Sequence, residues 1–132
     1  MKEILLLLVL ISCGIFAGCG GGSGSKEPKF EIIGEIIIAG DSVPYYSGVV
    51  KNTGDSSAWW VMLTFTIYED PEHAKIIGTD WIYLADGQEI APGQSCAFKI
   101  KIINLDGLAE NKLPTKEDLK YYSYKIIPLK HQ

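Results

Sequence analysis

The segment Glu69-Asp70-Pro71-Glu72-His73 is the part of this sequence whose residue types and spacing come nearest to a chemical site. Its carboxylates could hold calcium through oxygen ligands, and the added imidazole could suit zinc. The spacing matches no established metal-binding loop, however. A polar connection between two strands is therefore the favoured interpretation, and we predict no metal site and no cofactor.

The remaining reactive side chains do not form a catalytic set. His131 lies one residue from the end of the sequence, where a chain tends to fray. Cys96 alternates in phase with apolar residues, so we expect it to be a buried, unreactive thiol. Acidic residues are scattered over turns, which leaves no glycosidase pair to name. We predict a protein that is not an enzyme, with a hydrolase built on the acidic segment as the less favoured alternative.

The charge of the chain narrows the choice of partners. The formal net charge is −4, and all twelve basic residues are lysines. Nucleic-acid binding depends on phosphate neutralisation and on arginine forks, so we expect no nucleic-acid partner. A weakly acidic surface also gives no reason to expect electrostatic docking on an anionic membrane.

The first part of the sequence has the layout of a secretory signal. Lys2 is a minimal positive start, and residues 4–17 are almost entirely apolar. That run is shorter than the roughly 20 residues that cross a bilayer. Small residues then lead to Cys19. We predict a signal peptide over residues 1–18, with a plain cleaved signal that receives no lipid as the alternative.

Phe16-Ala17-Gly18-Cys19 resembles the lipobox of bacterial and archaeal lipoproteins, in which the cysteine thiol receives a lipid. The lipobox prefers leucine three positions before the cysteine, and the rival match Leu10-Ile11-Ser12-Cys13 has it. Cys19 is favoured because its apolar region is longer and a Gly/Ser-rich stretch begins directly after it. We predict lipid attachment at Cys19, a flexible linker over residues 19–29, and a domain over residues 30–132. This domain would lie outside the cytoplasmic membrane, which it would contact through the lipid anchor.

Residues 61–70 predict the central strand of that domain. Val61, Leu63, Phe65 and Ile67 alternate with polar residues, the period-two pattern of a strand with one buried face. Five further segments show strand patterns between turn signals: residues 30–38, 45–51, 75–84, 95–103 and 122–127. A seventh strand could lie around residues 89–90, and Pro128 is expected to end the last one. Thr115 and Asp118 have the spacing of a capping box, which predicts a short helical turn between residues 113 and 121. The prediction is an all-β sandwich.

The outward phase of the central strand carries more apolar side chains than solvent contact requires. Trp60, Met62 and Tyr68 share this phase, whereas Trp59 is expected to point inward with Val61. Trp, Met and Tyr are enriched in protein–protein interfaces. We predict a partner-contact face from Trp60, Met62 and Tyr68. The alternative is that a loop covers these side chains or that they only pair across the sheet.

Three stretches together resemble the FxLYD domain family of prokaryotic lipoproteins. They are Gly48-Val49-Val50-Lys51-Asn52-Thr53-Gly54, Phe65-Thr66-Ile67-Tyr68-Glu69, and Ile90-Ala91-Pro92-Gly93-Gln94 with Phe98. Adhesion-related immunoglobulin-like modules are the second resemblance. Either one implies an immunoglobulin-like β-sandwich of about seven strands with no catalytic residue to carry over.

The residues of the first stretch also have physical interpretations. Gly48 would let an aromatic ring of the facing sheet approach closely. Asn52 would hydrogen-bond the backbone of its own turn, and Gly54 would adopt a positive φ.

These observations predict a lipid-anchored, non-catalytic cell-envelope module that binds another envelope protein or a surface polymer. The alternative is a structural or assembly subunit whose edge strands join a membrane complex.

Overall fold

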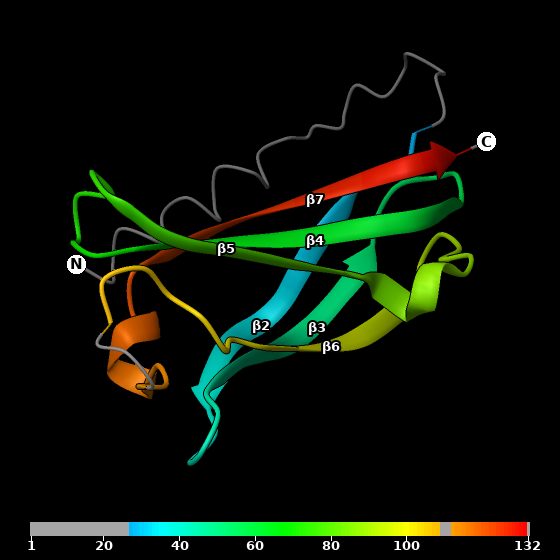
Figure 1. Cartoon of the computed structure of the whole chain (residues 1–132). Coiled ribbons are helices and arrows are strands. Elements are labelled where there is room, and N and C mark those ends of the chain that lie inside the picture. The colour runs from blue at the N-terminus through cyan, green and yellow to red at the C-terminus, as the bar shows by residue number, and fades with distance from the viewer. Residues whose placement is uncertain (1–26, 109–111, 132) are drawn as a thin grey trace.

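The structure, a computed structural model, describes residues 27–108 and 112–131. These residues form two three-stranded antiparallel sheets with strand orders β2-β3-β6 and β5-β4-β7 (Figure 1). The strands are β2 (Phe30–Ala39), β3 (Tyr45–Asn52), β4 (Ala58–Tyr68), β5 (Ile76–Tyr83), β6 (Ser95–Lys101) and β7 (Tyr122–His131). Two 3-10 turns, η1 (Leu84–Gly87) and η2 (Lys116–Leu119), complete the described elements. The predicted all-β sandwich is confirmed.

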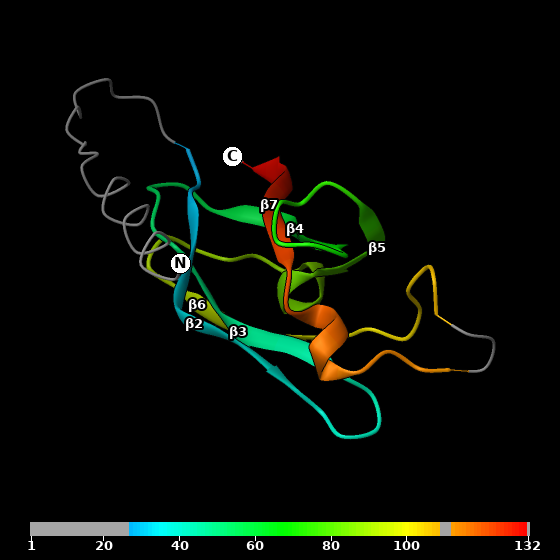
Figure 2. The same ribbon diagram turned by 90° about the vertical axis from the view of Figure 1, so that its left-hand side faces the viewer.

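Strand β4 is the centre of its sheet and supplies much of the core. Val61, Leu63, Phe65 and Ile67 are fully buried, and the residues between them are half-buried. Buried side chains of β3 and β6 meet them from the other sheet, and Figure 2 shows the two sheets lying on opposite sides of this core. Phe65 and Phe98 pack with their ring centroids 6.0 Å apart. The alternation in the sequence therefore predicted both the strand and its buried face.

The order of the strands is that of an immunoglobulin-type sandwich with fewer strands than predicted. The chain passes from β3 to β4 in the other sheet, returns with β6 to pair with β3, and crosses again with β7 to pair with β4. Within the described residues the proposed seventh strand is reduced to an isolated bridge between Ile90 and Ala58.

Pro128 does not end β7, which continues to His131. Pro128 lies opposite Val61, and the strand pairs with β4 on one side only. Proline lacks a backbone N–H, so an edge strand tolerates it where a central strand would lose a ladder hydrogen bond. His131, which was expected to fray, pairs with Ala58.

Two glycines of the first sheet have a structural role, one at a bulge and one beside an aromatic ring. The register of β2 against β3 shifts between Ile33 and Ile37, where Gly34 has a φ of 78°. Such a bulge was expected at this glycine. Gly48 lies opposite Phe98, and a β-carbon at position 48 would be 2.9 Å from that ring. The ring belongs to the neighbouring strand of the same sheet, so the prediction of a ring from the facing sheet was wrong.

Asn52 joins three segments at one end of the sandwich. Its side-chain amide donates to the carbonyl oxygens of Ser56 (3.0 Å) and Ile90 (2.9 Å), and its Oδ1 accepts from the backbone N–H of Gly54 at 2.9 Å. The predicted bond to its own turn is confirmed. Gly54 is not among the positive-φ glycines; instead it leaves room for the backbone around Glu27, which a β-carbon would strike.

The capping box at η2 is present as the sequence predicted. The backbone N–H of Thr115 donates to Oδ2 of Asp118 at 2.8 Å, as the box requires. The separate bond from the backbone N–H of Asp118 to the Thr115 carbonyl, at 3.0 Å, closes the 3-10 turn. This turn carries Leu119 into the core, where it is fully buried. The short helix predicted near the C-terminal end is therefore one 3-10 turn.

Candidate functional site: an apolar outer face and a tryptophan pocket

The acidic segment folds into a closed turn that uses its own polar groups. Oδ1 of Asp70 accepts a hydrogen bond from the backbone N–H of Ala74 at 2.8 Å, and Glu69 pairs with Lys75 at 3.4 Å. The ring of His73 stacks on Tyr68 with centroids 4.1 Å apart. Within residues 27–108 and 112–131, no group of three His, Cys, Asp or Glu side chains could hold a metal ion. These contacts fit the structural interpretation of the segment as a strand connection.

Cys96 has the predicted phase but less cover than expected. Cys96 belongs to β6, lies opposite Val50 of β3 and packs against the core, yet it is only half-buried. The reason is that β6 is an edge strand, which leaves one flank of the side chain open. Burial still raises the pKa of the Cys96 thiol, so the reactive thiolate is less populated at neutral pH.

The outer face of the β5-β4-β7 sheet gathers the apolar side chains that the sequence placed outward. Met62 lies opposite Tyr83 of β5 and Ile127 of β7, and Thr64 lies opposite Trp81. Residues directly opposite each other in a sheet point to the same side. We call this surface the outer face and define it by the residues Trp60, Met62, Trp81, Tyr83, Ile127 and Leu129.

Several members of the outer face are open to solvent. The exposed fractions are 47% for Trp60, 49% for Trp81, 40% for Ile127 and 55% for Leu129. Single exposed apolar residues are normal, but a group of large ones on one face of a sheet marks an interaction surface. The alternative was that a loop covers these side chains, but the described residues leave the four side chains partly exposed.

The aromatic rings of this face contact one another edge to face. The centroid of Tyr83 lies 5.2 Å from that of Trp60 and 5.1 Å from that of Trp81, with interplanar angles of 78° and 72°. Tyr83 thus separates and supports both indoles. Such pairs stabilise by about 0.5–1.5 kcal/mol beyond their buried area, which holds the rings in place before any partner arrives.

Tyr68 does not join Trp60 at the centre of this surface. The two residues are at opposite ends of β4, about 26 Å apart at the usual rise per residue of a strand. Tyr68 is half-buried, and its hydroxyl lies 3.1 Å from Oγ of Ser123. The predicted contact face is therefore divided, with Trp60 and Met62 in the exposed part and Tyr68 engaged elsewhere.

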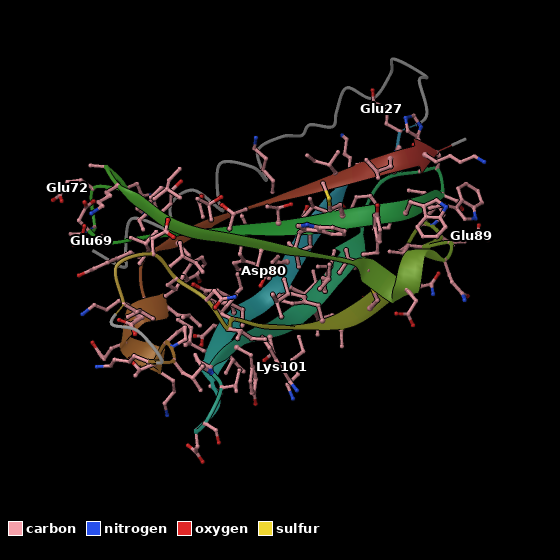
Figure 3. All side chains as sticks on the ribbon, in the orientation of Figure 1. Glu27, Glu69, Glu72, Asp80, Glu89 and Lys101 are labelled. Atoms are coloured by element: carbon pink, nitrogen blue, oxygen red, sulfur yellow. The ribbon has the colours of Figure 1, made fainter. Side chains whose placement is uncertain are left out.

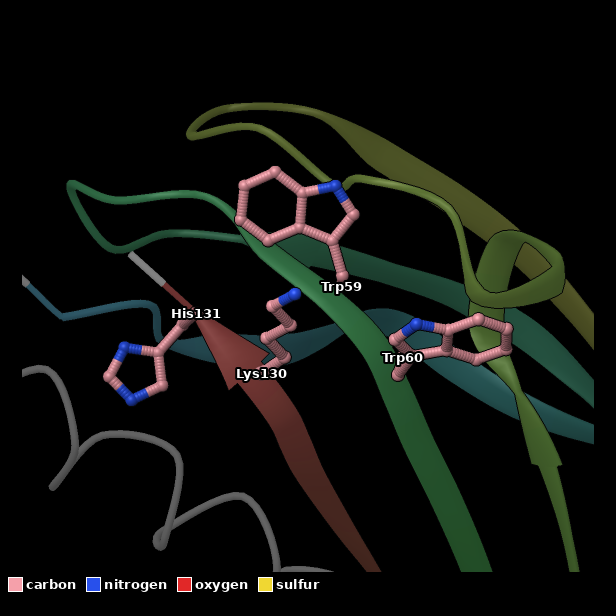
Figure 4. Close-up of a pocket in the computed structure, with 4 residues that line it drawn as sticks. All are labelled: Trp59, Trp60, Lys130 and His131. Atoms are coloured by element: carbon pink, nitrogen blue, oxygen red, sulfur yellow. The ribbon is translucent and has the colours of Figure 1, made fainter.

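The prediction that Trp59 points into the core was wrong. Trp60 has a φ of 52°, a left-handed conformation that is unusual for a bulky residue and turns the start of β4. Fully buried Ala58 takes part in the core instead. Both tryptophans line one open pocket of about 300 Å³ together with Lys130 and His131 from the end of β7 (Figure 4).

The indole of Trp60 packs against Gly87 of η1, another segment with left-handed backbone. Ala85, Asp86 and Gly87 also have positive φ values of 52°, 54° and 83°. Gly87 has to be glycine here, because a β-carbon would overlap the Trp60 indole. A non-glycine residue in this region costs about 1–2 kcal/mol. Strained backbone that persists at a solvent-exposed aromatic residue is an indicator of function.

Sequence reasoning missed Trp81, Tyr83, Ile127 and Leu129 as members of the surface. Trp81 and Tyr83 alternate within one segment, and Ile127 and Leu129 do so across Pro128, so the signal of a shared face was present within each strand. Which strands lie beside β4, and in which register, is a long-range property that one sequence does not contain.

Several predictions concern residues outside the described part of the chain. The signal peptide, Cys13 and Cys19 all belong to it, so the lipid attachment stays a prediction. Among the residues that are described, no helix is long and apolar enough to cross a membrane.

Comparisons with known proteins leave the chain without an assigned family. No protein-family profile matches it, and no curated protein is similar at a significant level. The resemblance to the FxLYD family therefore stays a prediction. Among solved structures, a β-glucosidase from Streptomyces venezuelae in complex with D-glucose aligns with 80% of this chain at 14% identity and a TM-score of 0.41. The chain spans 16% of that enzyme's length. A likeness at this level carries no functional argument.

Proposed function

We propose that the protein is a lipid-anchored, non-catalytic module of the cell envelope that binds another envelope protein or a surface polymer through its outer face. The exposure of Trp60, Trp81, Ile127 and Leu129 on one side of one sheet is the observation that carries this proposal. A water-exposed group of this kind gains free energy when a partner covers it, about 25 cal/mol for each Å² of apolar area removed from water.

The edge strands β2, β6 and β7 are less suitable for a partner than the outer face. Gly34 interrupts the edge strand β2 with a bulge, and Pro128 removes a backbone donor from the edge strand β7. Lys99 and Lys101 are exposed on the edge strand β6. Bulges, prolines and lysines are the devices that prevent edge-to-edge pairing. They disfavour the alternative in which β2, β6 or β7 joins this chain to a larger complex.

Site-specific photocrosslinking in intact cells tests the proposal. A photoreactive residue at Trp81 or Ile127 should give one adduct of defined mass with an envelope protein or polymer. The same residue at Lys99, which is exposed on the outer side of the opposite sheet, should give none. Equal adducts at all three positions, or none at any, would show that the outer face is not the binding surface.

A pair of double variants separates binding from folding. Trp81→Ala with Ile127→Ala should reduce adduct formation from a photoreactive Met62 position at least about tenfold, since anchors of this type contribute 1–4 kcal/mol each. Val49→Ala with Lys99→Ala, on the opposite sheet, is the matched control and should leave it unchanged. Circular dichroism would establish that both double variants fold. Undiminished capture by the first variant would refute the proposal.

A further inference from the structure

The two ends of strand β4 differ sharply in chemistry. At its start, Trp59 and Trp60 line a pocket with Lys130 and His131, and we call this the tryptophan end. At its finish lies the acidic turn with Glu69, Asp70 and Glu72. Figure 3 shows Glu69 and Glu72 at the opposite end of the molecule from Glu27 and Glu89. The sandwich therefore has one end marked by two tryptophans and one end marked by an acidic turn.

The described chain begins at the tryptophan end. The backbone N–H of Glu27 donates to Oδ1 of Asp55 at 3.1 Å, and the backbone N–H of Asp55 donates to the Glu27 carbonyl at 3.2 Å. The backbone N–H of Thr53 donates to the Lys29 carbonyl at 2.7 Å. The last residues of the predicted linker are thus bound to the loop that leads directly into Ala58 and the two tryptophans.

This attachment shortens the path from the domain to the predicted lipid. Eight residue steps separate Cys19 from Glu27, and a flexible chain of that length spans about 16 Å on average. Its upper limit is about 29 Å when fully extended. Strand β4 alone extends about 34 Å from Ala58 to Tyr68 at the rise of an antiparallel strand. The lipid therefore holds the tryptophan end close to the bilayer and leaves the acidic end out of its reach.

The side chains at the tryptophan end are those that lipid interfaces favour. Tryptophan is enriched at the level of the headgroups, where its amphipathic ring contacts both apolar chains and water. Lysine extends its charge toward the headgroups while its methylene stem lies along apolar surface. Two carboxylates of this end accept hydrogen bonds within the domain, Asp55 from the backbone N–H of Glu27 and Glu89 from the hydroxyl of Ser57 at 2.6 Å. The contact would thus depend on the indoles rather than on anionic lipid.

We propose that the tryptophan end is a second membrane contact, in which Trp59 and Trp60 insert into the headgroup region of the bilayer that holds the lipid anchor. The inference rests on the lipid attachment at Cys19 in the proposed function. It assigns Trp60 to the membrane, so a partner of the outer face would bind around Trp81 and Ile127. It orients the sandwich with β4 steeply inclined to the membrane, so that Trp81 and Ile127 stay accessible to a partner.

Fluorescence quenching by brominated lipids tests the contact, because the chain contains three tryptophans. The full-length protein, purified with its lipid, is placed in vesicles of phosphatidylcholine with bromine on the acyl chains near the headgroups. Trp59→Phe with Trp81→Phe leaves Trp60 as the emitter. Trp59→Phe with Trp60→Phe leaves Trp81, an equally exposed indole about 13 Å further along the sheet.

The expected result is at least about twofold stronger quenching for Trp60 than for Trp81, since only interfacial indoles reach the bromines. Replacing a fifth of the lipid by phosphatidylglycerol should change little. The proposal is overturned if Trp60 is quenched no more than Trp81 while the protein stays bound to vesicles. Failure to bind vesicles at all would contradict both the predicted lipid anchor and the proposed membrane contact.

The vesicles contain no protein partner, so the outcome is separate from that of the crosslinking experiment. Selective quenching of Trp60 without adducts at Trp81 would support the membrane contact and refute the outer-face partner. Adducts at Trp81 without quenching of Trp60 would do the reverse.

Discussion

Tyr46 of β3 stacks on Phe65 of β4 across the core, with ring centroids 4.3 Å apart and planes within 7° of parallel. The Tyr46 hydroxyl donates to the Leu119 carbonyl oxygen at 2.8 Å. One side chain therefore connects the two sheets and fixes the turn that leads into β7. Both aromatic residues are fully buried, so this contact is the natural place to test how the sandwich is held together.

Tyr46→Phe should lower the free energy of unfolding by about 1–2 kcal/mol, because it leaves the Leu119 carbonyl buried without its donor. Tyr45→Phe, at a half-buried neighbour whose ring lies under Lys99, is the matched control and should change it little. Urea unfolding measures both values. An equal loss in the two variants would assign the effect to something other than this hydrogen bond.

The same substitution should flatten the alkaline limb of the stability profile. Burial, followed by the nearby Tyr122, raises the pKa of Tyr46 above its usual value. The folded chain then keeps the phenol proton where the unfolded chain releases it, so stability falls as the pH rises above about 10. Tyr46→Phe removes part of that fall, as urea unfolding between pH 8 and pH 11 would show; an unchanged slope would contradict the assignment.

Phe65→Ala should cost about 3–5 kcal/mol of unfolding free energy, the usual range for truncating a buried phenylalanine. The ring contacts aromatic side chains of both sheets, including Tyr46 and Phe98. Thr66→Ala, one position along on the half-buried outward phase, should cost less than about 1 kcal/mol. Similar losses for both variants would mean that the core is not organised around this ring.

Asn52→Ala should destabilise the domain by about 2–4 kcal/mol, because two carbonyl oxygens and a backbone N–H lose their partner in a buried site. Asn104→Ala, at an exposed asparagine, is the control for the residue type and should be nearly neutral. Hydrogen exchange offers a second measurement. The amides of Gly54 and Asp55 should lose protection first in the Asn52 variant, and their continued protection would refute the role of this side chain.

Cys19→Ala should release the protein from the membrane fraction, whereas Cys13→Ala should not. The apolar run that ends before Cys19 and the Gly/Ser-rich stretch that follows it are the reasons. Membrane fractionation with mass spectrometry of the mature N-terminus would measure both. Retention of the Cys19→Ala protein in membranes, with release of the Cys13→Ala protein, would assign the lipid to Cys13.

Cys96 should react slowly with thiol reagents until denaturant is added. Its side chain is half-buried against the core, and burial raises the pKa of the thiol, so little thiolate is present. Ser95→Cys in a Cys96→Ala background places a thiol at the exposed neighbouring position and should react much faster. Equal rates for the two proteins in native buffer would contradict this placement.

The sequence predicted what depends on local alternation and local turns. The buried phase of β4, the bond of Asn52 to its own turn and the capping box of Thr115 and Asp118 are all interactions between near neighbours. The spacing of residue types along the chain is enough to predict such interactions. The packing of Trp60 against Gly87 was not predictable in this way, because the two residues lie far apart in the sequence.

The membership of the outer face shows the same limit. Trp60 and Met62 were placed correctly by phase, but Trp81 and Ile127 reach the same surface only through the register of β5 and β7 against β4. The prediction of a positive φ at Gly54 was wrong for a related reason, since the role of this glycine is to leave space for the backbone around Glu27. Each of these outcomes depends on segments that lie far apart in the sequence.

The contact between Gly87 and Trp60 predicts which residue pairs related chains can carry at these two positions. Any side chain at position 87 and a large ring at position 60 exclude each other, because both would occupy the same space. In related chains that keep this fold, the two positions should therefore covary: glycine accompanies the ring, and a small residue at 60 allows position 87 to change only to asparagine or aspartate, because the φ there is 83°. Lineages that lost the indole would then keep only the backbone constraint on the turn after β5.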